Sequence, residues 1–300
     1  MQNQSLPAVI NRLKKEKNAI ILAHVYQKGE IQDIADFIGD SLALSKKAME
    51  TSAEIIVFCG VSFMAETAHI LNPEKTVLLP CLDAGCGLAD MATINQLKKQ
   101  KEKYPEAAVV SYVNSTAEIK ALSDVCCTSA NALDIVTAMN QDTILFIPDK
   151  NLGSYIAEKC DKKIVLWDGY CYVHENIDPK TIKELKKQHH TAEIIVHPEC
   201  PKSIRDLADF IGGTGHMSRY VKESDCTEFI VGTEDNFSYR LKKDNPNKLF
   251  YPVNTSCEGM RKSSLTDVKN ALEKEQYKIT IDKDICEKAY KALETMMNLS

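Results

Sequence analysis

The chain contains 300 residues, of which 44% are hydrophobic and 26% are charged, as in ordinary globular proteins. Its formal net charge of −5 provides no basic surface, so neither nucleic acid nor an anionic membrane is expected as a partner. The N-terminus has no apolar signal segment, and no apolar run approaches the roughly 18 residues of a membrane span, so we expect a cytoplasmic protein.

Predicted elements recur in the same order three times along the chain. The first repeat has strands at 20–23, 54–58 and 76–80, the second at 108–111, 142–146 and 163–167, and the third at 193–196, 228–231 and 248–252. The periodic segment containing Ile34, Phe37, Ile38 and Leu42 is interpreted as an amphipathic helix between strands. Short strands that alternate with helices predict βαβ units and parallel sheets.

We therefore predict an α/β fold of three repeated α/β/α three-layer units with parallel sheets, related by a pseudo-threefold axis. The repeats are expected to cover residues 18–101, 102–187 and 188–275. Terminal helices within 1–17 and 276–300 are expected to pack on these repeats. Because ligands bind at the carboxyl ends of strands in open parallel sheets, the three units can surround one central site.

Polar side chains follow the first predicted strand of every repeat. They are His24, Tyr26, Tyr112, Asn114, His197 and Glu199. A hydroxyl stands at the start of each following helix, at Ser41, Ser129 and Thr214, and each lies at the same distance in sequence from the strand before it. An ordinary N-cap would explain any one hydroxyl alone, but the triplicate spacing favours contact with a ligand. The alternative is that duplicated domains simply keep duplicated residues.

A cysteine follows the last predicted strand of each repeat, at Cys86, Cys171 and Cys257, and the two intervals between them are nearly equal. The 11 cysteines include no C-x-x-C pair, so a metal site must be assembled from distant thiols. Three thiolates suit a [4Fe–4S] cluster with one open iron, which can polarise a substrate oxygen. A three-cysteine zinc site and ordinary buried thiols are alternatives. Cys81 competes with Cys86 but breaks the regular spacing.

Ten short segments occur in order through the three repeats. They are AHVYQ, GDS, FMAETA, DAGCGLADM, SYVNS, CTSANA, PDKNLG, DGYCYVH, HPEC and NTSCEGM. Over roughly residues 18–262 they resemble quinolinate synthases, the [4Fe–4S] enzymes of de novo NAD synthesis. The resemblance implies condensation of iminoaspartate (iminosuccinate) with dihydroxyacetone phosphate to quinolinate, phosphate and two waters. Functional coupling to an iminoaspartate-producing enzyme is also implied.

The resemblance implies roles for the candidate residues, with the three spaced cysteines as cluster ligands. Its substrate contacts fall on His24, Ser41, Tyr112, Asn114, Ser129, His197, Glu199 and Thr214. The expected catalytic set is His24, Tyr26, Tyr112, His174 and Glu199. Glu199 and the His24–Tyr26 pair suit proton transfer, and Tyr112 and Asn114 can donate to an oxyanion. The open iron is expected to act as a Lewis acid toward the hydroxyl lost last. His174 either touches substrate or orients its loop.

Two features depart from the pattern of that family. Gly212-Gly213-Thr214-Gly215 stands where many relatives read G-S-T-S, so anion contacts there are expected to rest on backbone N–H groups. Cys286 stands alone where some relatives carry a C-terminal C-x-x-C redox switch, so we expect no such switch. Two other functions stay open, namely a non-enzymatic cluster protein that carries electrons or senses redox state, and an aconitase-like hydro-lyase.

Overall fold

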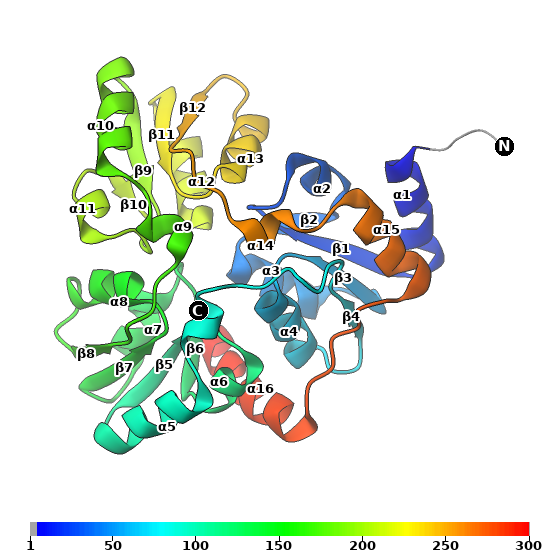
Figure 1. Cartoon of the computed structure of the whole chain (residues 1–300), viewed down its shortest axis with the longest axis horizontal. Helices are drawn as coiled ribbons and strands as arrows, with labels where there is room; N and C mark the ends of the chain where they lie inside the picture. The colour runs from blue at the N-terminus through cyan, green and yellow to red at the C-terminus, as the bar shows by residue number, and fades with distance from the viewer. Residues whose placement is uncertain (1–4, 300) are drawn as a thin grey trace.

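A computed structural model of the chain describes residues 5–299 and contains three four-stranded parallel sheets (Figure 1). The first consists, in spatial order, of β2 (Phe37–Gly39), β1 (Ala19–His24), β3 (Ile55–Cys59) and β4 (Thr76–Leu78). The second repeats this order with β6 (Val125–Cys127), β5 (Ala108–Tyr112), β7 (Thr143–Ile147) and β8 (Lys163–Leu166). The third contains β10 (Phe210–Ile211), β9 (Glu193–Val196), β11 (Glu228–Gly232) and β12 (Leu249–Pro252). The predicted α/β fold of three repeated α/β/α units is confirmed.

Helices connect the strands and flank each sheet (Figure 1). Those of the first half are α1 (Leu6–Glu16), α2 (Gly29–Ile34), α3 (Ser41–Glu50), α4 (Ser62–Leu71), η1 (Ala89–Met91), α5 (Ile94–Lys103), α6 (Ala117–Ala121) and α7 (Ala132–Ala138). Next come α8 (Lys150–Ala157), α9 (Tyr172–Glu175), α10 (Pro179–Gln188), α11 (Lys202–Arg205), α12 (Thr214–Glu223) and α13 (Asn236–Asp244). The last are α14 (Glu258–Arg261), α15 (Leu265–Lys274) and α16 (Lys283–Asn298).

The short second strand of each unit differs from the sequence prediction. The segment expected as one helix through Phe37 and Ile38 is instead the strand β2 between two helices. This strand pairs in parallel with β1, for example Phe37 with Leu22. Three residues are too few to reveal a strand period, and the hydrogen bonds that define β2 come from a strand outside the segment. The helix prediction is therefore wrong at the centre of this segment.

A carboxylate holds the first strand of every unit. In each case an aspartate just before the short second strand accepts a hydrogen bond from a backbone N–H of the first strand. The pairs are Asp36 with Ile21 at 2.8 Å, Asp124 with Val109 at 2.7 Å, and Asp209 with Ile194 at 2.8 Å. The aspartates occupy equivalent positions of the repeat, so this bond belongs to the framework that all three units share.

Apolar packing is distributed unevenly among the units. One continuous core joins a face of the first sheet, a face of the second sheet and α16. The third unit is packed mainly around two smaller cores, one of which also includes Val25 of the first unit. The first and second units therefore form one apolar body, and the third unit adjoins it with less shared apolar surface.

The helices near the chain ends pack on different units. Helices α1 and α15 lie together against the first sheet, while α16 lies against α6 and β6 of the second unit (Figure 1). The predicted third repeat, 188–275, thus includes a helix that packs on the first sheet, and the domain boundaries stay a prediction. Residues 1–4 and 300 of the predicted terminal segments lie outside the described residues. No helix within residues 5–299 has the length and apolar character needed to cross a membrane.

Candidate active site

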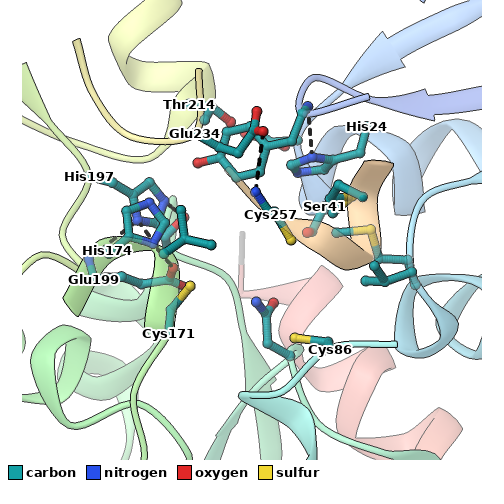
Figure 2. A pocket seen from close by; sticks show the side chains of 18 of the residues that line it. His24, Ser41, Cys86, Cys171, His174, His197, Glu199, Thr214, Glu234 and Cys257 are labelled. Carbon is teal, nitrogen blue, oxygen red and sulfur yellow. Dashed lines mark hydrogen bonds and ion pairs between the residues drawn. The ribbon is translucent and has the colours of Figure 1, made fainter. Parts of the chain in front are cut away.

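The carboxyl ends of the three sheets meet at one cavity (Figure 2). All thirteen side chains singled out from the sequence line it, namely His24, Tyr26, Ser41, Cys86, Tyr112, Asn114, Ser129, Cys171, His174, His197, Glu199, Thr214 and Cys257. Asp40, Val61, Phe63, Met64, Thr128, Val173, Glu234 and Met260 complete the lining. Each unit contributes residues, so the cavity exists only where all three meet. Their individual roles remain predictions.

Two histidines of the cavity wall are held in the same way. The Tyr26 N–H donates to His24 Nδ1 at 3.2 Å, and the Glu199 N–H donates to His197 Nδ1 at 3.3 Å. Burial lowers the pKa of each histidine to about 3, although the Glu199 carboxylate opposes that shift. Both rings are therefore neutral, and an Nδ1 that accepts places the ring proton on Nε2. Each histidine can then donate from Nε2.

Glu199 lies at the centre of a polar cluster. Its Oε2 is 2.7 Å from His174 Nδ1, and the His174 ring stacks on His197 with centroids 4.7 Å apart. Burial alone would raise the pKa of Glu199, but its coupling to the His197 and His174 imidazoles and a hydrogen bond from Tyr112 outweigh burial and lower it. Glu199 is therefore a buried carboxylate at neutral pH. Its Oε1 has no hydrogen-bond partner among the described residues.

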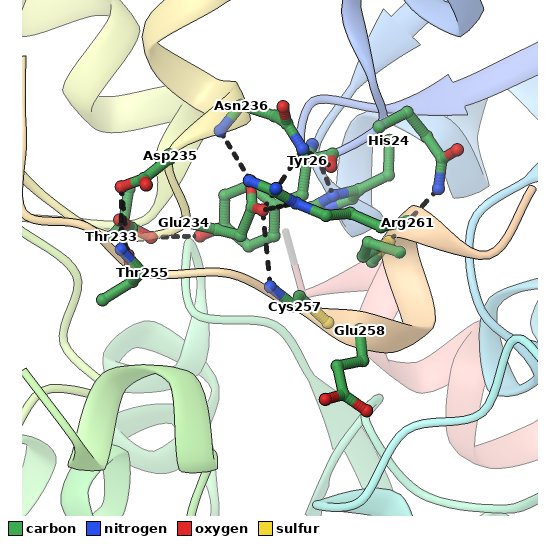
Figure 3. A network of polar contacts seen from close by, with 12 residues as sticks. His24, Tyr26, Thr233, Glu234, Asp235, Asn236, Thr255, Cys257, Glu258 and Arg261 are labelled. Carbon is green, nitrogen blue, oxygen red and sulfur yellow. Dashed lines mark hydrogen bonds and ion pairs between the residues drawn. The ribbon is translucent and has the colours of Figure 1, made fainter.

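Thr233 links the first and third units and was missed by the sequence prediction. Its Oγ1 lies 2.5 Å from the Tyr26 hydroxyl (Figure 3). The same oxygen lies 2.8 Å from His174 Nε2. The residue is fully buried just after β11. It joins Tyr26 to His174, whose other ring nitrogen approaches Glu199, so these four side chains form one continuous polar chain. The equivalent position of the second unit is Pro148, so the repeat carried no signal for it.

The hydroxyl residues are not ordinary helix caps. Asp40 and Gly213 are the N-caps of α3 and α12, so the N-cap alternative is wrong for Ser41 and Thr214, the first residues of these helices. Ser129 Oγ lies 3.1 Å from His197 Nε2. These hydroxyls line the cavity beside helix N-termini, where partial positive charge favours anions.

A second buried oxygen of the cavity, besides Glu199 Oε1, lacks a partner among the described residues. Asn114 Oδ1 has no hydrogen-bond partner among residues 5–299. Buried side-chain oxygens in folded proteins nearly always have a partner, so this oxygen is suited to a donor on a bound molecule. The observation favours a ligand site over a packed polar core.

The three spaced cysteines enter the cavity from the loops after β4, β8 and β12 (Figure 2). Burial raises the pKa of Cys86 to about 12 and raises the pKa values of Cys171 and Cys257, and Cys86 is electrostatically coupled to both other thiols. Metal coordination would deprotonate such thiols. The other eight cysteines, including Cys81, do not line the cavity.

The donor set fits an iron–sulfur cluster better than a single zinc ion. Among residues 5–299, the set of His, Cys, Asp and Glu side chains with ligand atoms all within 4.8 Å is Cys171, His174 and Glu199. The three cavity cysteines do not form such a set, whereas a tetrahedral zinc with bonds of about 2.3 Å brings its sulfurs to roughly 4 Å. A cluster bound through three separate irons accepts wider spacing. In that compact set, His174 Nε2 is already hydrogen-bonded to Thr233 and its Nδ1 lies 2.7 Å from Glu199, so both ring nitrogens contact protein groups.

The family follows from the whole sequence. The sequence model of the family described as quinolinate synthetase A protein matches residues 8–298. The chain belongs to the quinolinate synthase family. This membership covers all three units and both helices at the chain ends, which agrees with the order of the ten segments noted above.

Named relatives match over their full lengths. Quinolinate synthase 2 of Methanosarcina acetivorans is 47% identical over 302 aligned residues, which cover 100% of this chain and 97% of the relative. The quinolinate synthase of Thermodesulfovibrio yellowstonii is 48% identical, with 100% and 99% covered. That of Clostridium perfringens is 51% identical, with 97% of both chains covered.

The glycines that depart from the quinolinate synthase pattern lie where units approach closely. A Cβ at Gly213 would stand 2.7 Å from Ser129 Oγ, and a Cβ at Gly215 would stand 2.5 Å from Asp40 Oδ2. Any larger side chain at these two positions would therefore meet side chains of the first and second units. In this chain the glycines allow the third unit to approach both others.

Proposed function

We propose that the protein condenses iminoaspartate with dihydroxyacetone phosphate to give quinolinate, phosphate and two waters. Membership of the quinolinate synthase family supports the product. The observation that carries the proposal is the cavity in which three thiols from three units lie among histidines, hydroxyls and carboxyl groups. The two substrates are small anions, and the described residues that line the cavity offer polar donors but include no Lys or Arg.

Cys86, Cys171 and Cys257 are the proposed ligands of a [4Fe–4S] cluster. Such a cluster supplies one iron without a protein ligand, which is a Lewis acid for a substrate hydroxyl. The raised thiol pKa values imply that the protein holds these cysteines protonated until metal binds.

Substrate anions would be bound by neutral donors. Ser41 and Thr214 lie at the first turns of α3 and α12, where backbone N–H groups add partial positive charge. His24 and His197 would donate from Nε2, because their Nδ1 atoms accept backbone N–H groups. Neutral donors bind carboxylate or phosphate without forming a tight ion pair that would hinder product release.

Proton transfer is assigned to Glu199 and its neighbours. Glu199 Oε1 is the proposed base, since it is ionised, buried and without a hydrogen-bond partner among the described residues. The path through His174, Thr233 and Tyr26 can relay that proton across the cavity. Tyr112 and Asn114 would stabilise negative charge that develops on the substrate carbonyl.

A supplier of iminoaspartate is the proposed functional partner. Imines hydrolyse in water, so an enzyme that forms iminoaspartate from an amino acid should act close to this one in time and space. The predicted cytoplasmic location and the absence of nucleic-acid and membrane partners stay predictions.

The deciding experiment is an anaerobic assay of protein reconstituted with iron and sulfide. Iminoaspartate and dihydroxyacetone phosphate are supplied together, and each is omitted in turn as the control. We expect quinolinate only with both substrates. An intact cluster without quinolinate would refute the proposal. In that case, a reducible cluster whose spectrum ignores substrates would identify an electron carrier or redox sensor, and dehydration of another hydroxy acid would identify a hydro-lyase.

A further inference from the structure

Two buried carboxylates occupy equivalent positions in the second and third units. Asp149 follows β7, and Glu234 follows β11 at the matching place of the next repeat. Both side chains are fully buried. Removing a carboxylate from water is costly unless hydrogen bonds satisfy it, so two such groups beside a cavity require an explanation.

Each carboxylate accepts a hydrogen bond from the backbone of a cavity cysteine. The Cys171 N–H donates to Asp149 Oδ2 at 3.1 Å, and the Cys257 N–H donates to Glu234 Oε1 at 3.4 Å (Figure 3). The two acids differ in length by one methylene, yet both reach the same backbone atom of the cysteine. The shared contact, rather than a shared residue type, is what the two units have in common.

The second oxygen of each carboxylate anchors the following helix. Asp149 Oδ1 accepts the Leu152 N–H at 2.7 Å in the first turn of α8. Glu234 Oε2 accepts the Asn236 N–H at 2.8 Å at the start of α13. Each acid therefore connects its cysteine loop to a helix of its own unit. A neutral amide has only one acceptor oxygen and cannot make both contacts.

The first unit is built differently. Its position equivalent to Asp149 is Val61, which has no side-chain acceptor. The loop before Cys86 is held by the backbone, where the Ser62 N–H donates to Ala84 O at 2.8 Å. By contrast, the framework aspartates Asp36, Asp124 and Asp209 occur in all three units.

We propose that Asp149 and Glu234 are positioning residues that fix the loops of Cys171 and Cys257 so that both thiols face the cavity before a cluster is assembled. This inference rests on the proposed cluster ligation by these cysteines. It assigns each acid to its own thiol, and it leaves Cys86 independent of both.

The test measures thiol accessibility in the reduced, metal-free full-length chain. Single variants Asp149→Ala and Glu234→Ala are treated with iodoacetamide, and alkylation of each cysteine is followed by mass spectrometry. Loss of a hydrogen bond to a buried acid should raise the rate at the matching cysteine roughly tenfold or more. We expect Asp149→Ala to act most strongly at Cys171 and Glu234→Ala most strongly at Cys257. Equal acceleration at both thiols, or none in either variant, would overturn the proposal.

Asp124→Ala is the matched control, because it also removes a carboxylate that accepts a backbone N–H, but one that does not contact Cys86, Cys171 or Cys257. It should destabilise the fold without raising the alkylation rate of one cavity cysteine above the rates of the other two. If a variant loses its native circular dichroism, Asp149→Asn provides a near-isosteric replacement, which should raise Cys171 alkylation by less than alanine does. If every cysteine of the asparagine variant were alkylated as fast as in an unfolded chain, Asp149 would not act locally on the Cys171 loop.

A second readout uses reconstituted protein and a ferrous chelator. Residues that orient metal ligands typically contribute roughly 10- to 100-fold to metal affinity, so iron should leave both alanine variants about that much faster than it leaves Asp124→Ala. Equal rates of iron loss from Asp149→Ala, Glu234→Ala and Asp124→Ala would contradict the inference. Wild-type protein that binds no cluster would instead refute the proposed function, while the alkylation pattern would still test the positioning role.

Discussion

The boundary between the first and second units and the boundary of the third unit are held by different forces. The first two units share a continuous apolar core that α16 completes. The third meets the first through a small apolar contact at Val25 and through polar contacts at its edge. These include Lys243 to Asp33 at 2.5 Å, with side chains 50% and 45% exposed. It meets the second through the buried Arg205, which bonds Glu158 at 2.7 Å.

This difference matters because the third unit carries much of the chemistry. His197, Glu199, Thr214 and Cys257 all belong to it. The first two units thus form one apolar body with a fixed surface. Polar contacts with that surface determine where the third unit positions its cavity-lining side chains. Polar contacts contribute less to stability than a shared core but demand defined geometry.

The largest expected effect is in the shared core. Leu293 of α16 is fully buried in it, so Leu293→Ala should reduce the free energy of unfolding by about 2–5 kcal/mol. Urea denaturation would measure the loss. Leu299→Ala, at a side chain 42% exposed, is the control and should change stability by less than about 0.5 kcal/mol. Similar losses in both variants would mean that α16 is not part of the core.

A pH effect should follow from the two buried histidines. Their folded pKa values of about 3 lie below the ordinary 6.5, so the unfolded chain binds more protons between these values. Stability is therefore lost as pH falls from 6.5 toward 3, by up to about 1.4 kcal/mol per pH unit for each histidine. His197→Gln in the metal-free protein should flatten the slope between about pH 6.5 and 5, and His190→Gln, at an exposed site, should not. A slope unchanged by His197→Gln would show that this ring is not held neutral.

A smaller effect is expected where the second unit touches the loop of Cys257. The Tyr172 hydroxyl accepts the Glu258 N–H at 2.8 Å and hydrogen-bonds the Cys257 thiol. Tyr172→Phe should cost about 0.5–1.5 kcal/mol and speed alkylation of Cys257. Tyr251→Phe, which removes a hydroxyl bond to Glu228 inside the third unit, is the comparison. Faster alkylation in the Tyr251 variant alone would argue against this contact.

The smallest expected effect on stability is at the exposed edge between the first and third units. Asp33→Ala removes bonds to Lys243 and Tyr239 and should cost less than about 1 kcal/mol, because exposed ion pairs are weak. Because the contact crosses units, KM should nevertheless rise by up to about fivefold, the equivalent of about 1 kcal/mol. Asp206→Ala breaks an exposed pair within the third unit and should leave KM unchanged. Equal KM values in both variants would show that the edge contact does not place the third unit.

The repeat made much of this molecule predictable. The carboxyl ends of parallel strands lie along one edge of their sheet, so polar residues that directly follow strands gather at that edge. The regular spacing of such residues therefore predicted cavity-lining side chains in all three units. Elements whose partners lie far away in sequence were missed. The strand β2 depends on β1, and the helix α15 packs on the first sheet although it follows the third.

Residues that break the repeat were also missed. Thr233 bonds Tyr26 from a distant part of the sequence, and Pro148 stands at its equivalent place. Asp149 and Glu234 differ in type, and their equivalent in the first unit is Val61. A sequence repeat identifies the residues that all three units have in common. Residues that make contacts between units can differ from one unit to the next, so the repeat does not identify them.

The central claim is that three thiols, one from each unit, hold one cluster. Its most direct measurement is the iron and sulfide content of anaerobically reconstituted wild type, Cys86→Ala and Cys81→Ala. Cys81 lies shortly before Cys86 in the sequence but outside the cavity lining, which makes it a matched control. We expect about four irons per chain in the wild type and in Cys81→Ala, and loss of the cluster in Cys86→Ala. Full iron content in Cys86→Ala, or its loss in Cys81→Ala alone, would contradict the account.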